Sequence, residues 1–310
     1  MMRIVDLFCG CGGLSLGFIE AGFDVISAYD NWDEAIEIYK KNFSHPIYKQ
    51  DLTDVNLSSK IISEQQPDMI IGGPPCQDFS SAGKRDEDNG RGELTVCFAS
   101  IVANVRPKWF LMENVSQIQG TNKLKKARKI FEESGYGLTQ IILDASYCGV
   151  PQKRKRFFLI GKLGEKNEFL TDLIVSKMSN KPMTVRDYVG ETFGIEYYYR
   201  HPRSYARRGI FSIDEPSPTI RGVNRPMPKG YHLHSNDPVS SLDGIRSLTT
   251  KERFIIQTFP KSYVYDGAKT DLEQMIGNAV PVKLAKFVAE SILSYQIRPQ
   301  KLKENQLSLF

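Results

Sequence analysis

The chain has no apolar stretch long enough to cross a membrane. It also has few cysteines and histidines, the residues that form disulfides and bind metal ions in small proteins. Its five cysteines show neither the spacing of a disulfide framework nor that of a zinc ribbon. His232 and His234 have no further ligands nearby in the sequence, so we predict no metal site. The first residues do not have the pattern of a signal peptide. These absences argue against a membrane protein or a disulfide-rich secreted domain and favour a reduced, cytoplasmic protein.

What is present is typical of a globular enzyme. The 310 residues are 41% hydrophobic and 25% charged, which is enough for one large core with a smaller lobe. The formal net charge of +5 and a sequence pI near 8.8 are compatible with a polyanionic partner.

Short apolar runs alternate with amphipathic stretches from residue 1 to about residue 165, which is the pattern of βαβ units. Strands are predicted at 4–8, 25–29, 69–71, 109–112 and 157–160, and helices at 14–20 and 34–41. From about 170 to 245 the pattern is lost, and Pro, Tyr, Arg and His accumulate. Helical periodicity returns at 249–257 and 282–295. We therefore expect a mainly parallel α/β domain that is interrupted by a basic, aromatic-rich lobe.

A glycine-rich turn follows the first predicted strand, in Asp-Leu-Phe-Cys-Gly-Cys-Gly-Gly-Leu at 6–14. Such turns let the backbone approach a ligand and present amides at a helix start. The spacing is not that of dinucleotide-binding turns, because Ser15 takes the place of the third glycine. Asp30 ends the second predicted strand, where it suits the ribose hydroxyls of an adenosine, and Asp51 follows a presumed third strand, where it suits the adenine amino group. Singly, each acid is more often a surface charge.

Cys76 lies in Gly-Gly-Pro-Pro-Cys-Gln-Asp-Phe-Ser at 72–80, directly after a predicted strand. Two prolines stiffen the loop, and a rigid loop at the carboxyl end of a strand suits a nucleophile. The alternative is a buried structural cysteine, which the polar neighbours disfavour.

Two further motifs place a glutamate and two arginines on or near predicted strands. Glu113 follows the strand at 109–112, where an acid can donate to a ring nitrogen or simply cap a helix. Gln152, Arg154 and Arg156 alternate, so we expect them to share one face of a strand. The alternative is that these charged residues have no specific role and simply face the solvent.

The segment at 74–80, Pro-Pro-Cys-Gln-x-Phe-Ser, resembles the nucleophile loop of the DNA cytosine-5 methyltransferases. The likeness covers nearly the whole chain in the family's order, through Glu-Asn-Val at 113–115, Gln-x-Arg-x-Arg at 152–156 and Gly-Asn-Ala-Val at 277–280. It implies a Rossmann-like, S-adenosylmethionine-dependent α/β fold with a small target-recognition domain. The implied organisation is a catalytic and cofactor-binding domain at 1–168, target recognition at 169–247, a return to the catalytic domain at 248–296 and a C-terminal tail at 297–310.

The resemblance also assigns roles to residues. It implies that the catalytic residues are Cys76, Glu113, Arg154 and Arg156. It implies that S-adenosylmethionine is bound by Phe8, Gly10, Gly12, Gly13, Asp30, Asn31, Asp51, Pro75, Leu94, Asn278 and Val280, with Trp32 an alternative to Asn31 for covering the adenine. It implies that DNA is contacted by Gln77, Ser80, Gln152, Thr219, Arg221 and Arg225.

The implied reaction is methyl transfer to C5 of a cytosine flipped out of double-stranded DNA, through a covalent bond between Cys76 and C6. The divergent lobe leaves the recognised DNA sequence open. The resemblance also makes a cognate restriction endonuclease a possible partner.

Other enzymes and one non-enzyme compete with this interpretation. A cysteine protease or acyltransferase would need a histidine base, and none of the four histidines lies near Cys76 in sequence. An amino methyltransferase would carry Tyr or Trp after Pro-Pro. An RNA cytosine-5 methyltransferase is the nearest rival, but the Cys-Phe-Thr element of the branch that methylates transfer RNA is absent. A catalytically silent DNA-binding protein would not need Glu113 and Arg156 beside Cys76.

The last five residues, Gln-Leu-Ser-Leu-Phe at 306–310, resemble the peptide with which bacterial proteins bind the sliding clamp. A tail ending in Leu309 and Phe310 can place two apolar anchors in a groove. The alternative is that the tail folds back on its own domain.

Overall fold

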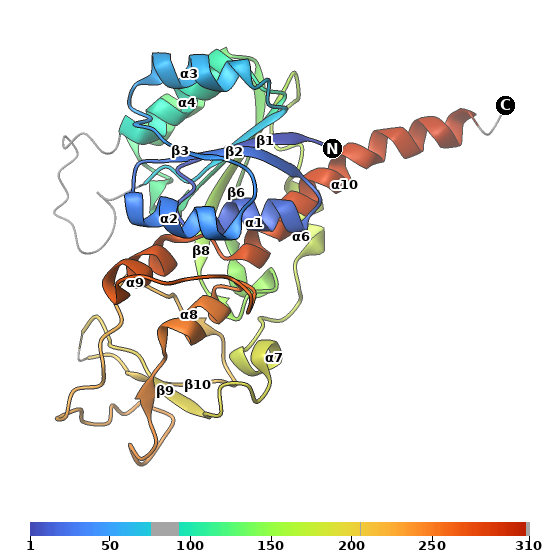
Figure 1. Ribbon diagram of the computed structural model, residues 1–310. Helices are drawn as coiled ribbons and strands as arrows, with labels where there is room; N and C mark the ends of the chain where they lie inside the picture. The colour runs from blue at the N-terminus through green and yellow to red at the C-terminus, as the bar shows by residue number, and fades with distance from the viewer. Residues whose placement is uncertain (76–92, 205, 308–310) are drawn as a thin grey trace. The chain divides into compact units, whose positions relative to one another are not determined.

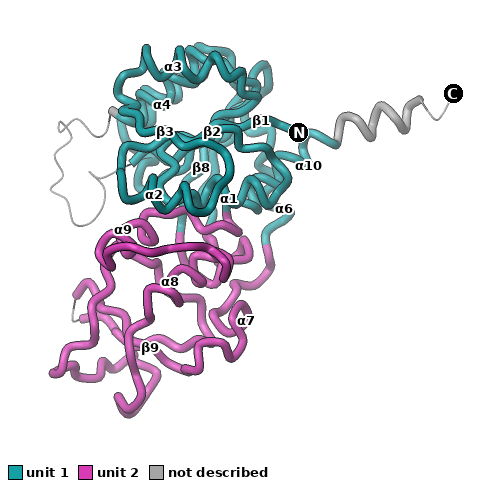
Figure 2. Tube along the Cα trace, in the orientation of Figure 1, with its two compact units in different colours: residues 1–143, 155–178, 285–310 teal, residues 144–154, 179–284 magenta. Residues whose placement is uncertain are grey.

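The computed structural model describes the backbone of residues 1–75, 93–204 and 206–307, and the side chains of the same residues except 93 and 298–307. Contacts within the chain divide it into two compact units, which Figure 2 colours separately. Unit 1 comprises residues 1–143, 155–178 and 285–310, and unit 2 comprises residues 144–154 and 179–284. Within these described ranges, no helix combines the length and the apolar character that a membrane span requires.

Among the described residues, unit 1 is built on a seven-stranded sheet in the order β3-β2-β1-β4-β5-β8-β6. The strands are β1 Arg3–Leu7, β2 Asp24–Asp30, β3 Ile47–Lys49, β4 Met69–Gly72, β5 Trp109–Val115, β6 Tyr136–Asp144 and β8 Lys155–Leu163. Neighbours from β3 to β5 pair in parallel, and β8 runs antiparallel to β5. The mainly parallel α/β sheet expected from the sequence is confirmed.

Each of the five apolar runs coincides with a strand, because the central strands of a covered sheet are buried on both faces and are apolar throughout. β6 was not predicted. It is the last strand in the sheet order, and polar residues such as Thr139 and Gln140 interrupt its apolar pattern.

Helices cover both faces of this sheet. Figure 1 shows α3 and α4 on one side of the strands and α1 and α2 on the other. The bounds are α1 Gly13–Glu20, α2 Asp33–Asn42, α3 Val55–Glu64, α4 Glu93–Val105, α5 Asn122–Glu133 and α6 Thr171–Lys177. Alternate strand residues such as Val5, Leu7 and Phe110 join the core under α3, α4 and α5. Phe110 stacks on Phe131 of α5 at 4.0 Å between ring centroids. Burying a side chain of this size contributes about 1.5–3 kcal/mol.

The last helix, α10 (Val282–Leu307), continues beyond the predicted end at residue 295. Its residues 296–307 are rich in Lys, Gln, Glu and Leu, which have high helix propensity, although the segment includes Pro299. In unit 1, Tyr295 of this helix packs edge to face on Trp109 of β5 at 6.1 Å and on Phe169 at 5.2 Å. These contacts attach the helix to the sheet.

Unit 2 contains little regular structure. Its elements are η3 Ala145–Tyr147, β7 Gln152–Lys153, α7 Val185–Val189, β9 Tyr197–Tyr199, β10 Ile210–Ser212, β11 Ser217–Pro218, β12 Arg246–Ser247, α8 Thr250–Ile256 and α9 Lys269–Asn278. In its described part, β10, β9 and β12 form a three-stranded sheet, and β11 pairs with β7. The predicted helix at 249–257 is α8, which begins at a capping box between Thr249 and Glu252.

The units divide the chain at places other than the predicted domain boundaries. The sequence places the return to the first domain at residue 248, whereas the contacts keep residues 248–284 in unit 2. The reason is a set of long-range polar contacts. Arg253 of α8 donates to the carbonyl of Arg221, and Gln257 accepts from the Gln152 amide at 2.7 Å. These bonds join α8 to the lobe and to residues 144–154.

Candidate active site

The turn between β1 and α1 has left-handed backbone at three positions. The angle φ is +58° at Phe8, +53° at Gly10 and +82° at Gly12. A side chain at Gly12 would also lack space, because a Cβ there would lie 2.4 Å from the ring of Phe43. Glycine is therefore required at position 12 for conformation and for packing. The result is a tight turn that brings backbone amides to the start of α1.

Asp30, at the end of β2, holds this turn in place. Its Oδ2 accepts from the Gly10 amide at 2.7 Å, and its Oδ1 accepts from the amides of Asn31 and Trp32 at 2.8 and 2.9 Å. A carboxylate has about four acceptor positions, so Asp30 retains about one for a ribose hydroxyl. The parallel register of β1 and β2, with Leu7 opposite Tyr29, places the turn and the acid side by side. This geometry fits a ligand with an adenosine moiety.

A chain of hydrogen bonds lies buried behind the turn. Ser15 donates to Asp6 at 2.5 Å, Tyr39 donates to Ser15 at 2.7 Å, and Tyr39 and His45 are 2.6 Å apart. Asp6 is fully buried, and burial raises the pKa of its carboxyl to about 8, with the Ser15 hydrogen bond opposing and the charge of Asp30 adding to the rise. Burial also lowers the pKa of His45. The sequence analysis did not predict these hydrogen bonds, although it noted that Ser15 takes the place of a third glycine.

The remaining predicted cofactor residues are distributed over both units. In unit 1, Asn31 is exposed and Trp32 is half-buried, so the structure does not by itself choose between them as the cover of an adenine. Asp51 is exposed and accepts from the amide and hydroxyl of Thr53, and these hydrogen bonds lower its pKa. Leu94 is half-buried near the start of α4, Pro75 is exposed, and Gly13 is buried at the start of α1.

In unit 2, Asn278 is exposed at the end of α9 and accepts from Gln274 at 3.0 Å, while Val280 is buried. Both residues follow Gly277, whose Cα packs against the backbone of residues 221–222.

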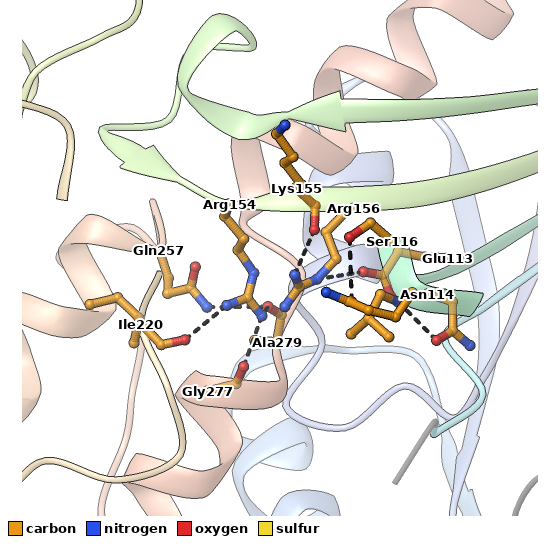
Figure 3. Close-up of polar contacts among 12 residues, drawn as sticks. Glu113, Asn114, Ser116, Arg154, Lys155, Arg156, Ile220, Gln257, Gly277 and Ala279 are labelled. Atoms are coloured by element: carbon orange, nitrogen blue, oxygen red, sulfur yellow. Dashed lines mark hydrogen bonds and ion pairs between the residues drawn. The ribbon is translucent and has the colours of Figure 1, made fainter. Parts of the chain in front are cut away.

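Glu113 and Arg156 form a nearly buried ion pair at the carboxyl end of β5, with 3.0 Å between Arg156 Nε and Glu113 Oε1 (Figure 3). Arg156 stands opposite Val115 in the antiparallel ladder, so it is a diagonal neighbour of Glu113 on the same face. Burial lowers the pKa of Arg156, and the charge of Glu113 opposes that change. The predicted acid and the second arginine of the Gln-x-Arg-x-Arg motif are thus in direct contact.

The loop that leads to Cys76 is attached to the same strand end. Asn114 donates its side-chain amide to the carbonyl of Pro74 at 3.0 Å. Glu113 Oε2 lies against Gly73, 3.3 Å from where a Cβ would stand. Cys76 follows two residues after Pro74, and it lies outside the described residues, as do Gln77 and Ser80.

Gln152 and Arg154 have contacts that differ from the predicted ones. Both are fully buried in unit 2. Arg154 donates to the carbonyls of Ile220, Gly277 and Ala279 at 2.8–3.0 Å (Figure 3). Gln152 donates to Gln257 and accepts from the Ile220 amide at 2.8 Å. These side chains hold segments of unit 2 together, and contact with DNA or a base would require them to leave these partners.

Gln257 is a residue that the sequence analysis missed. It donates to the carbonyls of Ile276 and Ala279, the second at 3.1 Å, and so completes the network around Gln152. No local motif marks it, because its partners lie far away in sequence.

The predicted recognition residues lie in unit 2. Thr219 donates to the carbonyl of Lys153 at 2.7 Å, Arg221 donates to the carbonyl of His201, and Arg225 is exposed. The structure brings Arg221 and Arg225 to the lining of one small hollow.

Solved structures share this architecture. The Dnmt2 methyltransferase of S. pombe superposes with a TM-score of 0.67 over 97% of this chain and 99% of its own, at 19% sequence identity. The Entamoeba histolytica methyltransferase EhMeth gives a TM-score of 0.67 over 97% and 99%, at 18% identity. This likeness shows the fold, a Rossmann-like α/β architecture with a mainly parallel sheet.

The model of the C-5 cytosine-specific DNA methylase family matches residues 2–294, and the chain belongs to that family. The enzyme is therefore a DNA cytosine-5 methyltransferase, and the resemblance found in the sequence is confirmed. It is 62% identical to the type II methyltransferase M.HindV of Haemophilus influenzae, over 96% of this chain and 98% of the relative. It is 50% identical to the type II methyltransferase M.HgiDI of Herpetosiphon aurantiacus, over 99% and 98%.

Proposed function

We propose that the enzyme transfers a methyl group from S-adenosylmethionine to C5 of a cytosine flipped out of a specific double-stranded DNA sequence, through a Cys76–C6 bond. The observation that supports this most strongly is the Glu113–Arg156 pair beside the anchored start of the Cys76 loop. Cytosine C5 is a weak nucleophile, so an enzyme must first add electron density to the ring. A thiolate and an acid held at one strand end can do so together.

The steps follow from the residues. The Cys76 thiolate adds to C6, and Glu113 acts in its protonated form, with the proton on the oxygen that Arg156 does not hold. It donates this proton to N3 as charge develops there, and takes it back when Cys76 leaves. Because Arg156 binds Glu113 Oε1, the oxygen beside Gly73, Oε2, is the one we assign to the base. S-adenosylmethionine would supply an electrophilic methyl group to C5 and leave as S-adenosylhomocysteine when its bond from sulfur to methyl breaks. A base then removes the C5 proton, and the electron pair of that bond expels Cys76 by elimination.

The residues of the glycine turn fit the cofactor. Gly10 and Gly12 provide a backbone that a ligand can approach closely, and Asp30 offers a further acceptor position to a ribose. We assign S-adenosylmethionine binding to this turn together with Phe8, Asp51 and Leu94. Calorimetric titration with S-adenosylhomocysteine should show a clear loss of affinity in Asp30→Ala and none in Asp33→Ala, an exposed acid three residues later. Equal affinities would remove Asp30 from the site.

Base flipping follows from the position of the target atoms, since C5 and C6 cannot be reached inside a stacked duplex. Extrusion costs a few kcal/mol, which DNA contacts must offset. We assign such contacts to Gln77, Ser80 and the recognition residues of unit 2.

Sequencing of bisulfite-treated DNA from cells that express the protein tests the function and reveals the recognised sequence. The wild-type protein should protect cytosine at one short motif, and Cys76→Ser should abolish that protection. A matched Cys97→Ser variant should retain it, because Cys97 lies in α4 outside the predicted site. Absence of protected cytosine with the folded wild-type protein would overturn the proposal.

The type II relatives also suggest a partner. We propose that the enzyme protects DNA from a cognate restriction endonuclease with the same recognition sequence. An endonuclease from the same cells should cleave unmethylated DNA at the motif found by bisulfite sequencing, and should leave DNA treated with this enzyme intact. Cleavage of both DNAs would contradict the pairing.

A second partner is suggested by residues 306–310. We propose that this segment docks the enzyme on the bacterial sliding clamp, which would bring it to newly replicated duplex. Titration of the clamp with the full chain and with a chain ending at residue 305 should show binding only for the full chain. Equal binding, or none, would refute the proposal.

A further inference from the structure

Unit 2 gathers five arginines around one small hollow. They are Arg200, Arg203, Arg221, Arg225 and Arg253. All except Arg203 line the hollow itself, together with His201 and Asn224. Four of the five lie within 26 residues of sequence, and α8 supplies Arg253.

The positive charge of this cluster is largely uncompensated. Burial and the charge of Arg221 together lower the pKa of Arg200 to about 10. The pKa of Arg253 is also lowered to about 10, by burial and by Arg221. Arg253 forms an ion pair with Glu273, but the other four arginines form no ion pair with any carboxylate in the described ranges. An anion would therefore be stabilised here.

The arginines divide into an anchored floor and an exposed rim. Arg200 donates to the carbonyl of Thr219 at 2.8 Å, and Arg221 donates to the carbonyl of His201. Arg203 and Arg225 are exposed, and their guanidinium groups form no hydrogen bond with the residues that the structure describes. The floor side chains are thus held by backbone carbonyls, while the guanidinium groups of the rim are exposed and can contact a ligand.

The geometry favours a phosphate over a base. The hollow is small, with a cavity volume of about 20 Å³, so a ligand would place single acceptor atoms in it and not a whole nucleobase. A phosphate is an anion and matches the uncompensated positive charge of the lining, whereas the edge of a base is neutral. Arg200 and Arg221 each direct one donor to a backbone carbonyl, which holds both side chains at the hollow. Four arginines line this one hollow, and several guanidinium groups around a small space match the oxygens of one phosphate group.

We propose that the hollow bounded by Arg200, Arg221 and Arg225, with Arg203 at its rim, binds a backbone phosphate of the DNA duplex. The inference rests on the proposed function and deepens it, because it assigns Arg221 and Arg225 to the positioning of DNA and not to the choice of sequence.

The test is the salt dependence of DNA binding by the full chain. The probes are a duplex carrying the motif found by bisulfite sequencing and a duplex of equal length without it. For Arg225→Gln and for Arg203→Gln, the slope of log K against log salt should fall by about 1. Between 50 and 200 mM salt, the affinity difference from wild type should shrink by about 3.5-fold. The loss should be equal on both duplexes.

Two further variants separate the alternatives. Arg207→Gln removes an exposed arginine from the same segment, outside the hollow, and should leave the slope at the wild-type value. Arg225→Lys keeps a charge for a phosphate but loses a bidentate contact to guanine, so it should restore the slope without changing which motif is methylated. An unchanged slope in both Gln variants, or a loss confined to the duplex with the motif, would overturn the inference. Absence of any methylation by the wild type would instead overturn the proposed function.

Discussion

Glu113 shows how one side chain can be held in place and still face a substrate. Its Oε1 is fixed by Arg156, and its Oε2 is directed to Gly73 at the start of the Cys76 loop. The neighbouring Asn114 fixes that loop through the Pro74 carbonyl. Two successive residues of β5 therefore position the acid and the entry to the nucleophile.

Removal of the acid should reduce the chemical step far more than binding. We expect Glu113→Gln to lower the single-turnover rate of methyl transfer by about 10²–10⁴-fold, because the amide cannot transfer a proton to N3. Affinity for DNA should change little. Glu133→Gln, at an exposed position of α5, is the matched control and should react at the wild-type rate. A rate for Glu113→Gln within twofold of wild type would contradict the assigned role.

Asp6 is a second residue with a measurable signature. Its carboxyl has a pKa of about 8 in the folded enzyme and an ordinary value near 3.8 when unfolded. Between these values the unfolded chain loses this proton and the folded chain keeps it, so the free energy of unfolding must fall as pH rises. Above pH 8 both states are ionised and the fall ends.

Asp6→Asn should remove this dependence, because the amide is neutral at every pH and can still accept from Ser15. Urea unfolding at pH 5 and pH 8 measures it. We expect the stability advantage of wild type over Asp6→Asn to decrease by more than about 1 kcal/mol between the two pH values. A constant difference would show that Asp6 is ionised in the folded state.

At the scale of elements, the glycine turn was predictable because its backbone restricts the residue type. The strands were predictable because buried central strands are continuously apolar, as at 69–71 and 109–112. The contacts of Gln152 and Arg154 were not, because their partners lie 66–125 residues away in sequence. Their alternation in sequence predicted that they share one face of a strand. It could not predict that a later segment of the chain would cover that face.

The turn provides a prediction with an internal control. Gly12 and Gly22 both have positive φ, at 82° and 93°, but only Gly12 lacks space for a Cβ. Alanine at either position should cost about 1–2 kcal/mol for its backbone conformation. Gly12→Ala should cost more and should weaken cofactor binding, because it displaces the stacked rings of Phe43 and Tyr39. Thermal unfolding and calorimetry measure both effects. Equal losses in the two variants would show that packing at Gly12 is unimportant.

At the scale of the molecule, the residues that we assign to catalysis and those that we assign to DNA binding lie mainly in different units. Unit 1 carries the glycine turn, Glu113 and Arg156, together with the start of the Cys76 loop. Unit 2 carries the arginine cluster and little regular structure. A surface of that kind can change its loops without disturbing the sheet, which is why the sequence identified the chemistry but left the recognised DNA open.

The covalent step is the central claim, and DNA with 5-fluorocytosine at the methylated position tests it most directly. Fluorine at C5 cannot leave as a cation, so elimination is blocked after methyl transfer and the enzyme remains bound. With S-adenosylmethionine, we expect a complex that survives denaturation and whose modified peptide contains Cys76. Without S-adenosylmethionine, or with Cys76→Ser, no such complex should form. A stable complex through another residue, or none with active wild-type enzyme, would contradict the account.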